Sequence, residues 1–135
     1  MSPVPIEPPV TDVSAPFWEA TRQRMLLLQW CVDCDRPIFY PREVCPLCMG
    51  SALEWRRASG RGAVYAVTVE HHPQHPAMNE IAPYPVALVD LDEGVRMLSR
   101  LVGCSDPRVG MSVNVTWEEL TDGRNLPLFE PAKES

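Results

Sequence analysis

The sequence predicts a mainly β protein with one N-terminal helix, a small metal-binding module and a closed barrel of five or six strands. Three observations support this fold class. The chain has 135 residues, of which 15 are proline, so long helices are disfavoured and a single domain or a small module on a modest barrel is expected. Two C-x-x-C pairs stand between residues 31 and 48. Beyond them, short apolar segments alternate with turn signals, as in small barrels.

A single helix is expected near the N-terminus. Residues 1–13 form an extended arm, because four prolines interrupt any helix there. Ser14 followed by Pro16 is a typical helix start. Beyond this start, four residues recur at near-helical spacing: Phe17, Thr21, Met25 and Leu28. We therefore expect a helix over about residues 15–27.

The remaining elements are expected to be strands. Two short ones, 27–31 and 37–40, flank the first cysteine pair, as is usual around a zinc knuckle. Six more follow at about 53–58, 62–71, 85–92, 95–102, 112–119 and 125–129. Turn signals separate them at Ser59-Gly60-Arg61-Gly62, Glu93-Gly94, Asp106-Pro107 and Asp122-Gly123. Closing five or six such strands into a barrel removes the exposed edges of an open sheet.

These elements divide the chain into four parts. We expect the arm over residues 1–13, the helix and metal module over 14–52, the barrel over 53–131 and a short tail over 132–135. No run of about 18 apolar residues marks a membrane span, and the proline-rich, acidic N-terminus lacks a secretory pattern. We therefore expect a soluble, cytoplasmic protein.

The charge distribution argues against a polyanionic partner. The formal net charge is −6, and the barrel region from residue 62 onward holds five bases and eleven acids. Residues 22–61 hold seven arginines and four acids, but four thiolates bound to one divalent zinc would leave this region only weakly basic. A nucleic acid would meet little electrostatic attraction here.

The four paired cysteines have the spacing of a tetrahedral metal site. Each C-x-x-C pair grips from a tight turn, and the intervening ten residues can bring the two pairs opposite each other. The predicted ligands are Cys31, Cys34, Cys45 and Cys48. Asp35 and Met49 stand where glycine often follows such a knuckle, a departure that Gly50 is expected to offset in part. The fifth cysteine, Cys104, is expected to be a small buried residue at a strand end.

Three interpretations of this site are open. Structural zinc, one ion per chain, is the one we adopt, because two pairs in a reducing compartment favour a metal over a disulfide. A rubredoxin-type iron site uses the same four sulfurs, whereas a redox dithiol needs one pair and a different fold around it. Four thiolates leave no open position for water, so the metal is expected to hold structure and do no chemistry.

Several stretches resemble one known family, in which a rubredoxin-like zinc ribbon precedes an OB-fold and which was long known as a domain of unknown function, number thirty-five. The stretches are "APFWEATRQRMLLLQWCVDCDRPIFYPREVCPLC", "EWRRASGRGAVYAVTVEHHP", "YPVALVDLDEGVRMLSRLVG" and "LPLFEP". The resemblance extends over about residues 14–131, and the order of its motifs is more specific than either module alone. It implies a zinc ribbon followed by an OB-fold barrel.

The resemblance also implies a function. Members of the family are non-catalytic partners of thiolase-superfamily enzymes, including thiolases and the retro-aldolases that cleave a steroid side chain as its CoA thioester. We therefore expect an accessory subunit in a hetero-oligomer, acting in steroid side-chain or fatty-acid degradation and helping to form the acyl-CoA site. The family's zinc ligands correspond to the four paired cysteines, and the resemblance assigns no catalytic residue.

Candidate contacts to CoA or to the partner come from arginines and histidines. CoA pairs phosphates with an apolar arm, so its site needs guanidinium donors beside an apolar channel. The candidates are Arg56, Arg57 and Arg61 near the module junction, Arg22 and Arg24 on the helix, and His71, His72 and His75 in the loop "EHHPQHPAMNEIAPYP". The competing interpretation is that each is a solvated surface residue.

Two other functions are considered. A single-stranded nucleic-acid-binding OB module is the main alternative, but it needs a basic groove with exposed aromatic residues. A small hydrolase would need a nucleophile with a base, or a carboxylate pair in a cleft. Asp90, Asp92 and Glu93 are the nearest to such a pair, and they are more simply solvated residues at the end of a hairpin.

Overall fold

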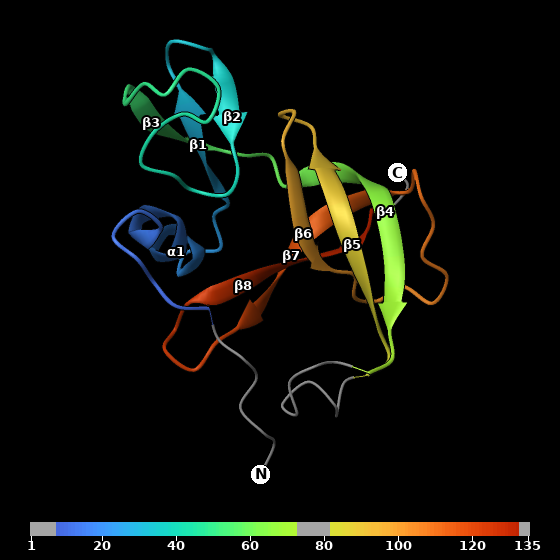
Figure 1. Ribbon diagram of the computed structural model, residues 1–135. Coiled ribbons are helices and arrows are strands. Elements are labelled where there is room, and N and C mark those ends of the chain that lie inside the picture. The colour runs from blue at the N-terminus through green and yellow to red at the C-terminus, as the bar shows by residue number, and fades with distance from the viewer. Residues whose placement is uncertain (1–7, 73–81, 133–135) are drawn as a thin grey trace.

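The computed structural model describes residues 8–72 and 82–132 and confirms the mainly β prediction. A small sheet and the helix lie beside a larger, curled sheet (Figure 1). The elements are α1 (Ala15–Thr21), β1 (Leu27–Cys31), β2 (Arg36–Ile38), β3 (Leu53–Arg57), β4 (Arg61–Glu70), β5 (Tyr84–Leu91), β6 (Arg96–Arg100), β7 (Ser112–Glu119) and β8 (Asn125–Pro131). No helix in these ranges is long and apolar enough to cross a membrane.

The helix is shorter than predicted, because it ends at Thr21 rather than near residue 27. Arg24 adopts a left-handed φ of 56° and donates its N–H to the Thr21 carbonyl at 2.9 Å. The next N–H, of Met25, returns to the Ala20 carbonyl at 3.1 Å. This pair of bonds is a Schellman-type helix end, usually marked by glycine. Because Arg24 and not a glycine holds this left-handed position, no residue in the sequence marked the end of the helix.

The small sheet has the order β2-β1-β3. All five residues of β1 pair antiparallel with β3, from Leu27 opposite Arg57 to Cys31 opposite Leu53. We had expected residues 53–58 to be the first barrel strand, and this expectation is wrong. The chain after the second cysteine pair returns alongside β1, so β3 completes the metal module.

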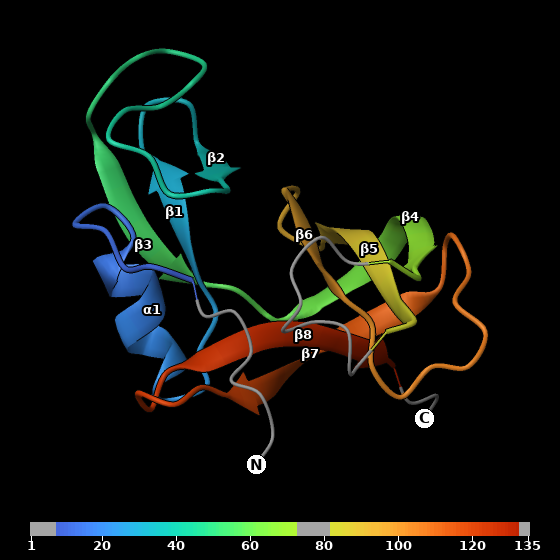
Figure 2. The same cartoon turned by 60° about the horizontal axis from the view of Figure 1, so that its bottom comes forward.

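The larger sheet has the order β6-β5-β4-β7-β8, with antiparallel neighbours throughout. It curls until its edge strands β6 and β8 approach each other, where Leu101 forms a parallel bridge with Phe129 (Figure 2). Five antiparallel strands whose two edges meet in parallel correspond to the expected small barrel. Its interior holds Val64, Val89, Val113 and Phe129, each at most 2% exposed.

The helix and the barrel share one hydrophobic core. Phe17 and Trp18 of α1 belong to the same buried cluster as Val89 and Phe129 of the barrel, together with Leu28 of β1. The metal module is therefore packed against the barrel, because its first strand, β1, contributes a side chain to the shared core.

Gly62→Ala should lower the free energy of unfolding by about 1–3 kcal/mol, the usual range for overpacking. Gly62 is buried on β4, and a Cβ there would lie 2.5 Å from the carbonyl oxygen of Asp90, a backbone atom that cannot move aside cheaply. Urea unfolding of both variants measures the change. Thr68→Ala, an exposed position on the same strand, should change stability by less than about 0.5 kcal/mol. Equal stability of the two variants would show that the close approach at Gly62 is wrong.

Candidate functional site

The structure brings the four predicted metal ligands together. Their Sγ atoms all lie within 4.8 Å of one another. Cys31 Sγ is 3.7 Å from Cys48 Sγ, and Cys45 Sγ is 4.0 Å from Cys34 Sγ. A tetrahedron with metal–sulfur bonds of about 2.3 Å places its sulfurs roughly 3.8 Å apart. The spacing therefore fits a tetrahedral zinc or iron ion.

Backbone N–H groups support the sulfurs. The N–H groups of Cys34, Leu47 and Gly50 each donate to a cysteine Sγ at 3.4 Å. Such bonds favour the thiolate over the thiol. Hydrogen bonds from the backbone N–H groups of Cys48 and Leu47 lower the pKa of the Cys45 thiol to about 7.

The pKa values of Cys31 and Cys34 shift in the opposite direction. Hydrogen bonding to Cys48, followed by burial, raises the pKa of Cys34 to about 12. Cys45 therefore forms a thiolate more readily than Cys34 does, and a bound metal would displace the proton of Cys34. Metal affinity is expected to fall as the pH is lowered.

The cysteine cluster forms the buried centre of the small module, where a larger domain would have a hydrophobic core. Cys31 and Cys45 are 0% and 1% exposed and form a small buried cluster with Ile38, against which Leu53 packs. This cluster is too small to hold the module together alone. A metal bound by four thiolates would supply the missing stability and leave no position for substrate.

Gly50 does not compensate for the missing glycines at positions 35 and 49, although we had expected it to do so. Asp35 and Met49 themselves adopt left-handed φ values of 54° and 62°, whereas Gly50 does not. The carboxylate of Asp35 accepts a hydrogen bond from Trp30 Nε1 at 3.1 Å, which stabilises its turn. Met49 is 69% exposed, so its side chain offers little compensation for the strained backbone.

Met49→Gly should stabilise the module by about 0.5–1 kcal/mol, because glycine adopts a positive φ without steric strain. Thermal melting of the zinc-loaded protein measures the gain. Leu47→Gly is the matched control: Leu47 is 66% exposed in the same turn, but its φ is not positive, so glycine should destabilise it. A less stable Met49→Gly variant would contradict the strained turn.

The candidate arginines do not form one site. Arg56 lies over the Trp30 ring at 4.5 Å and forms an ion pair with Glu54. Arg61 pairs with Asp92 at 3.5 Å, and Arg22 Nη1 donates to the Asp122 carbonyl at 2.6 Å. Arg24 and Arg57 are exposed, and neither has an ion-pair partner among the described residues.

Two of the candidate histidines lie at the opposite end of β4 from Arg61. His71 and His72 are exposed directly after β4, and His75 lies outside the described residues. Arg61 begins β4, a strand of 10 residues. At about 3.3 Å per residue, an extended strand of this length spans roughly 30 Å. Arg61 is therefore far from His71 and His72, and these residues do not form one site.

The acidic hairpin has structural contacts. Asp90 pairs with Arg96 at 2.6 Å, and Glu93 Oε2 accepts the N–H of Ser59 at 2.9 Å. Within residues 8–72 and 82–132, the four cysteines are the one group of three or more His, Cys, Asp or Glu residues placed to hold a metal. Neither a nucleophile with a base nor an open metal site emerges from these described ranges.

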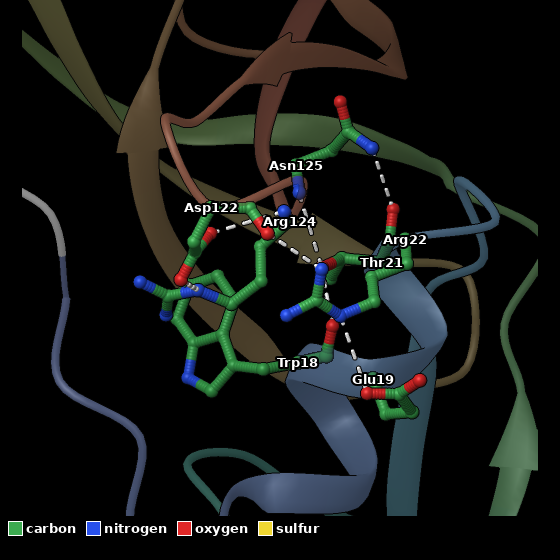
Figure 3. A network of polar contacts seen from close by, with 7 residues as sticks. All are labelled: Trp18, Glu19, Thr21, Arg22, Asp122, Arg124 and Asn125. Carbon is green, nitrogen blue, oxygen red and sulfur yellow. Dashed lines mark hydrogen bonds and ion pairs between the residues drawn. The ribbon is translucent and has the colours of Figure 1, made fainter.

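A polar clasp joins α1 to the β7–β8 turn, and sequence reasoning did not find it. Arg124, 5% exposed, donates to Asp122 Oδ2 at 2.6 Å (Figure 3). It also donates to the Pro8 carbonyl at 2.8 Å. Asn125 donates from Nδ2 to the Thr21 carbonyl at 2.8 Å. The sequence showed only an Asp-Gly turn at this place. Its partners lie about a hundred residues away in the chain, so no local pattern reveals the clasp.

A second missed feature is a groove of about 350 Å³ between α1, the end of β2 and the barrel edges β6 and β8. Phe17 and Trp18 line it from the helix, and Phe39 and Tyr40 from the metal module. Leu98 of β6 closes part of the barrel side. The run Phe39-Tyr40 after the first cysteine pair was the available signal, but nothing in the sequence placed it opposite β6.

Family models match both halves of the chain. Residues 18–54 match "ChsH2, rubredoxin-like zinc ribbon domain" and residues 55–118 match "ChsH2, C-terminal OB-fold domain". A "DUF35 domain-containing scaffold protein" of Methanocaldococcus jannaschii is 30% identical over 109 residues, which cover 78% of this chain and 77% of that protein. This chain belongs to the DUF35 family. The expected family, with its zinc ribbon and OB-fold, is confirmed.

Two other relatives are larger proteins. A "Probable enoyl-CoA hydratase alpha subunit" of Thermomonospora curvata is 41% identical over 119 residues, covering 86% of this chain but 37% of that protein. The "3-oxo-4,17-pregnadiene-20-carboxyl-CoA hydratase alpha subunit" of Mycobacterium tuberculosis is 43% identical over 76 residues, 24% of its length. The present chain therefore spans a minor part of both hydratase subunits.

Two solved structures share the DUF35 fold. A chain of "Ltp2-ChsH2(DUF35) aldolase" superposes with a TM-score of 0.82 at 38% identity, covering 94% of this chain and all of that one. A DUF35 protein of Sulfolobus solfataricus with unknown function superposes with a TM-score of 0.66 at 15% identity and shows the fold alone.

Proposed function

We propose that this DUF35 chain is a non-catalytic accessory subunit that binds and supports a thiolase-superfamily enzyme, a thiolase or a retro-aldolase, acting on an acyl-CoA thioester. The observation that carries the proposal is its similarity, over 94% of its length, to the DUF35 chain of an aldolase. The archaeal relatives, which are named as scaffold proteins, agree with this proposal. Steroid side-chain or fatty-acid degradation is the proposed setting.

The metal centre supports a structural role. We propose that Cys31, Cys34, Cys45 and Cys48 hold one zinc ion per chain, with iron as the alternative for the same donor set. The ion would fix the two knuckles and the β1–β3 sheet. An iron tetrathiolate is coloured and zinc is not, so the absorption spectrum and metal analysis of the purified protein distinguish them.

Exposed arginines are the proposed contacts to the partner or to CoA phosphates. Arg24 and Arg57 are the strongest of the candidates, because no ion pair within the described ranges occupies them. Arg22, Arg56 and Arg61, with His71, His72 and His75, remain proposals of the same kind. The nucleic-acid alternative gains no support from a barrel region with five bases and eleven acids.

Co-expression with a thiolase-superfamily protein from the same organism tests the proposal. A stable hetero-oligomer on size-exclusion chromatography is expected. Arg57→Glu should weaken the complex, whereas Arg108→Glu should not, because Arg108 is exposed but already paired with Asp106. Two proteins that elute separately at micromolar concentration would contradict the proposal.

A further inference from the structure

The groove between α1, the metal module and the barrel edges has aromatic walls. The rings that line it come from all three parts of the structure and are Phe17, Trp18, Phe39, Tyr40 and Tyr84. Grooves lined in this way bind proline-rich segments, because a polyproline II helix is already ordered before it docks and loses little entropy. The walls therefore have the chemistry of a site for an extended, proline-rich segment.

The groove offers no free charge to an occupant. Among the described residues that line it, Arg100 is the one charged side chain, and it forms an ion pair with Glu118. Ser99 Oγ already donates to the Pro127 carbonyl at 2.8 Å. A charged occupant would lose its hydration without gaining a partner, so a neutral, apolar segment fits these walls.

One donor beside the groove lacks an acceptor within the described ranges. Trp18 is 3% exposed and lines the groove, and its Nε1 is buried without a hydrogen-bond partner. The indole nitrogen lies on the side of the ring turned away from Thr21 and Asn125 (Figure 3). A polyproline II helix makes no internal hydrogen bonds, so its carbonyl oxygens are free to accept one. The indole N–H therefore suits the backbone of such a segment.

The N-terminal arm carries a segment of this kind next to the groove. Residues 3–6 read Pro-Val-Pro-Ile, an uncharged and apolar run that favours a polyproline II helix. They lie outside the described residues, but Glu7 alone separates them from Pro8, with which the described chain begins. At about 3.1 Å per residue, four residues of this helix extend over roughly 12 Å.

Pro8 anchors this segment beside the groove. It lines the groove itself, and its carbonyl accepts a hydrogen bond from Arg124 Nη1 at 2.8 Å. The guanidinium of Arg124 also lies 5.0 Å from the Trp18 ring. A segment tethered this closely meets the groove at an effective concentration of millimolar order, so modest contacts suffice to hold it there.

We propose that the Pro-Val-Pro-Ile segment docks in the aromatic groove as a polyproline II helix, with one of its carbonyl oxygens accepting a hydrogen bond from Trp18 Nε1. The arm is then a built-in occupant, which any other ligand of the groove must displace. This inference concerns the chain by itself and does not depend on the proposed function.

Nuclear magnetic resonance of the full, zinc-loaded chain tests the docking. Nuclear Overhauser effects are expected between the methyl groups of Val4 and Ile6 and the ring protons of Trp18 and Phe39. Ile6→Asp should abolish these effects and shift the Trp18 indole N–H resonance, because the apolar walls exclude the charge. Ile6→Val keeps the segment apolar and should retain both signals.

A position on the other side of Pro8 supplies the matched control. Val10 is 50% exposed and does not line the groove. Val10→Asp adds the same charge to the arm and should leave the Overhauser effects and the Trp18 resonance unchanged. The resonances of the barrel interior report whether each variant is folded.

The outcomes are distinct from those that test complex formation. Absence of Overhauser effects between the segment and the groove rings in the parent chain would overturn the proposal, as would equal changes in Ile6→Asp and Val10→Asp. Effects that disappear on dilution would show that the arm of a second copy fills the groove, and they would also overturn it. Effects that persist on dilution and are lost in Ile6→Asp alone would support it.

Discussion

Cys45→Ser should abolish metal binding and unfold the metal module. The Cys45 side chain is 1% exposed, and its Sγ belongs to the four-sulfur cluster and to the small core around Cys31 and Ile38. Binding free energies of structural zinc are about 10–16 kcal/mol, and in such modules they are folding free energies. Serine offers a poor ligand, so most of this stabilisation should be lost. Metal analysis and circular dichroism of the purified variant measure both effects.

The fifth cysteine supplies the control for this variant. Cys104 lies outside the four-sulfur cluster and is partly buried. Cys104→Ser should keep one zinc ion per chain and melt within a few degrees of the parent protein. A Cys45→Ser variant that retained a full equivalent of metal, or that melted like the parent, would show that the centre is not the structural element assigned here.

Arg124→Ala should lower the free energy of unfolding by about 2–4 kcal/mol, because it breaks a buried charged hydrogen-bond set. The guanidinium lies 5.0 Å from the Trp18 ring and binds both Asp122 and the Pro8 carbonyl. Its removal leaves these acceptors without their donor and opens space beside Trp18. Helix α1 should loosen from the barrel, which hydrogen exchange of the Thr21 and Asn125 amides would detect together with denaturant unfolding.

An exposed pair of the same kind is the matched control. Arg108 and Asp106 form an ion pair with side chains 75% and 67% exposed. Surface pairs contribute about 0–1 kcal/mol, so Arg108→Ala should change stability little. Equal effects of Arg108→Ala and Arg124→Ala would contradict the clasp.

The clasp also predicts a pH dependence. The N–H of Arg124, and then its guanidinium, lower the pKa of Asp122 below its ordinary value of 3.8. A carboxylate with a depressed pKa in the folded state contributes stability that is present above the unfolded pKa and is lost as the pH falls through the folded value. Arg124→Ala removes the guanidinium part of this effect. The stability difference between parent and variant should therefore shrink as the pH drops below about 4.

The predictable features are those encoded by short spacings. The interval between the cysteine pairs predicted that the four Sγ atoms come together as a group able to hold a metal, and alternation with turn signals located β4 to β8 within a few residues. The end of α1 was missed because an arginine, Arg24, takes the left-handed position usually held by glycine. The place of β3 was missed because its short sequence, Leu-Glu-Trp-Arg-Arg, predicts a strand but does not say which sheet the strand joins.

The Arg124 clasp and the aromatic groove could not be predicted from the sequence. The Arg124 clasp and the aromatic groove each join segments from the two ends of the chain, and no local pattern records such a meeting. The arginine and histidine candidates were grouped by chemistry alone. The length of β4 separates Arg61 from His71 and His72, so the roles of these residues depend on where a partner binds.

Turnover of an acyl-CoA thioester by a reconstituted pair tests the central claim most directly. The thiolase-superfamily partner is assayed alone, with the zinc-loaded chain and with the Cys45→Ser variant, and the zinc-loaded chain is assayed alone. We predict no turnover by the chain alone, weak turnover by the partner alone and a large increase only when the intact chain is added. Turnover by the chain without a partner, or full activity of the partner in its absence, would contradict it.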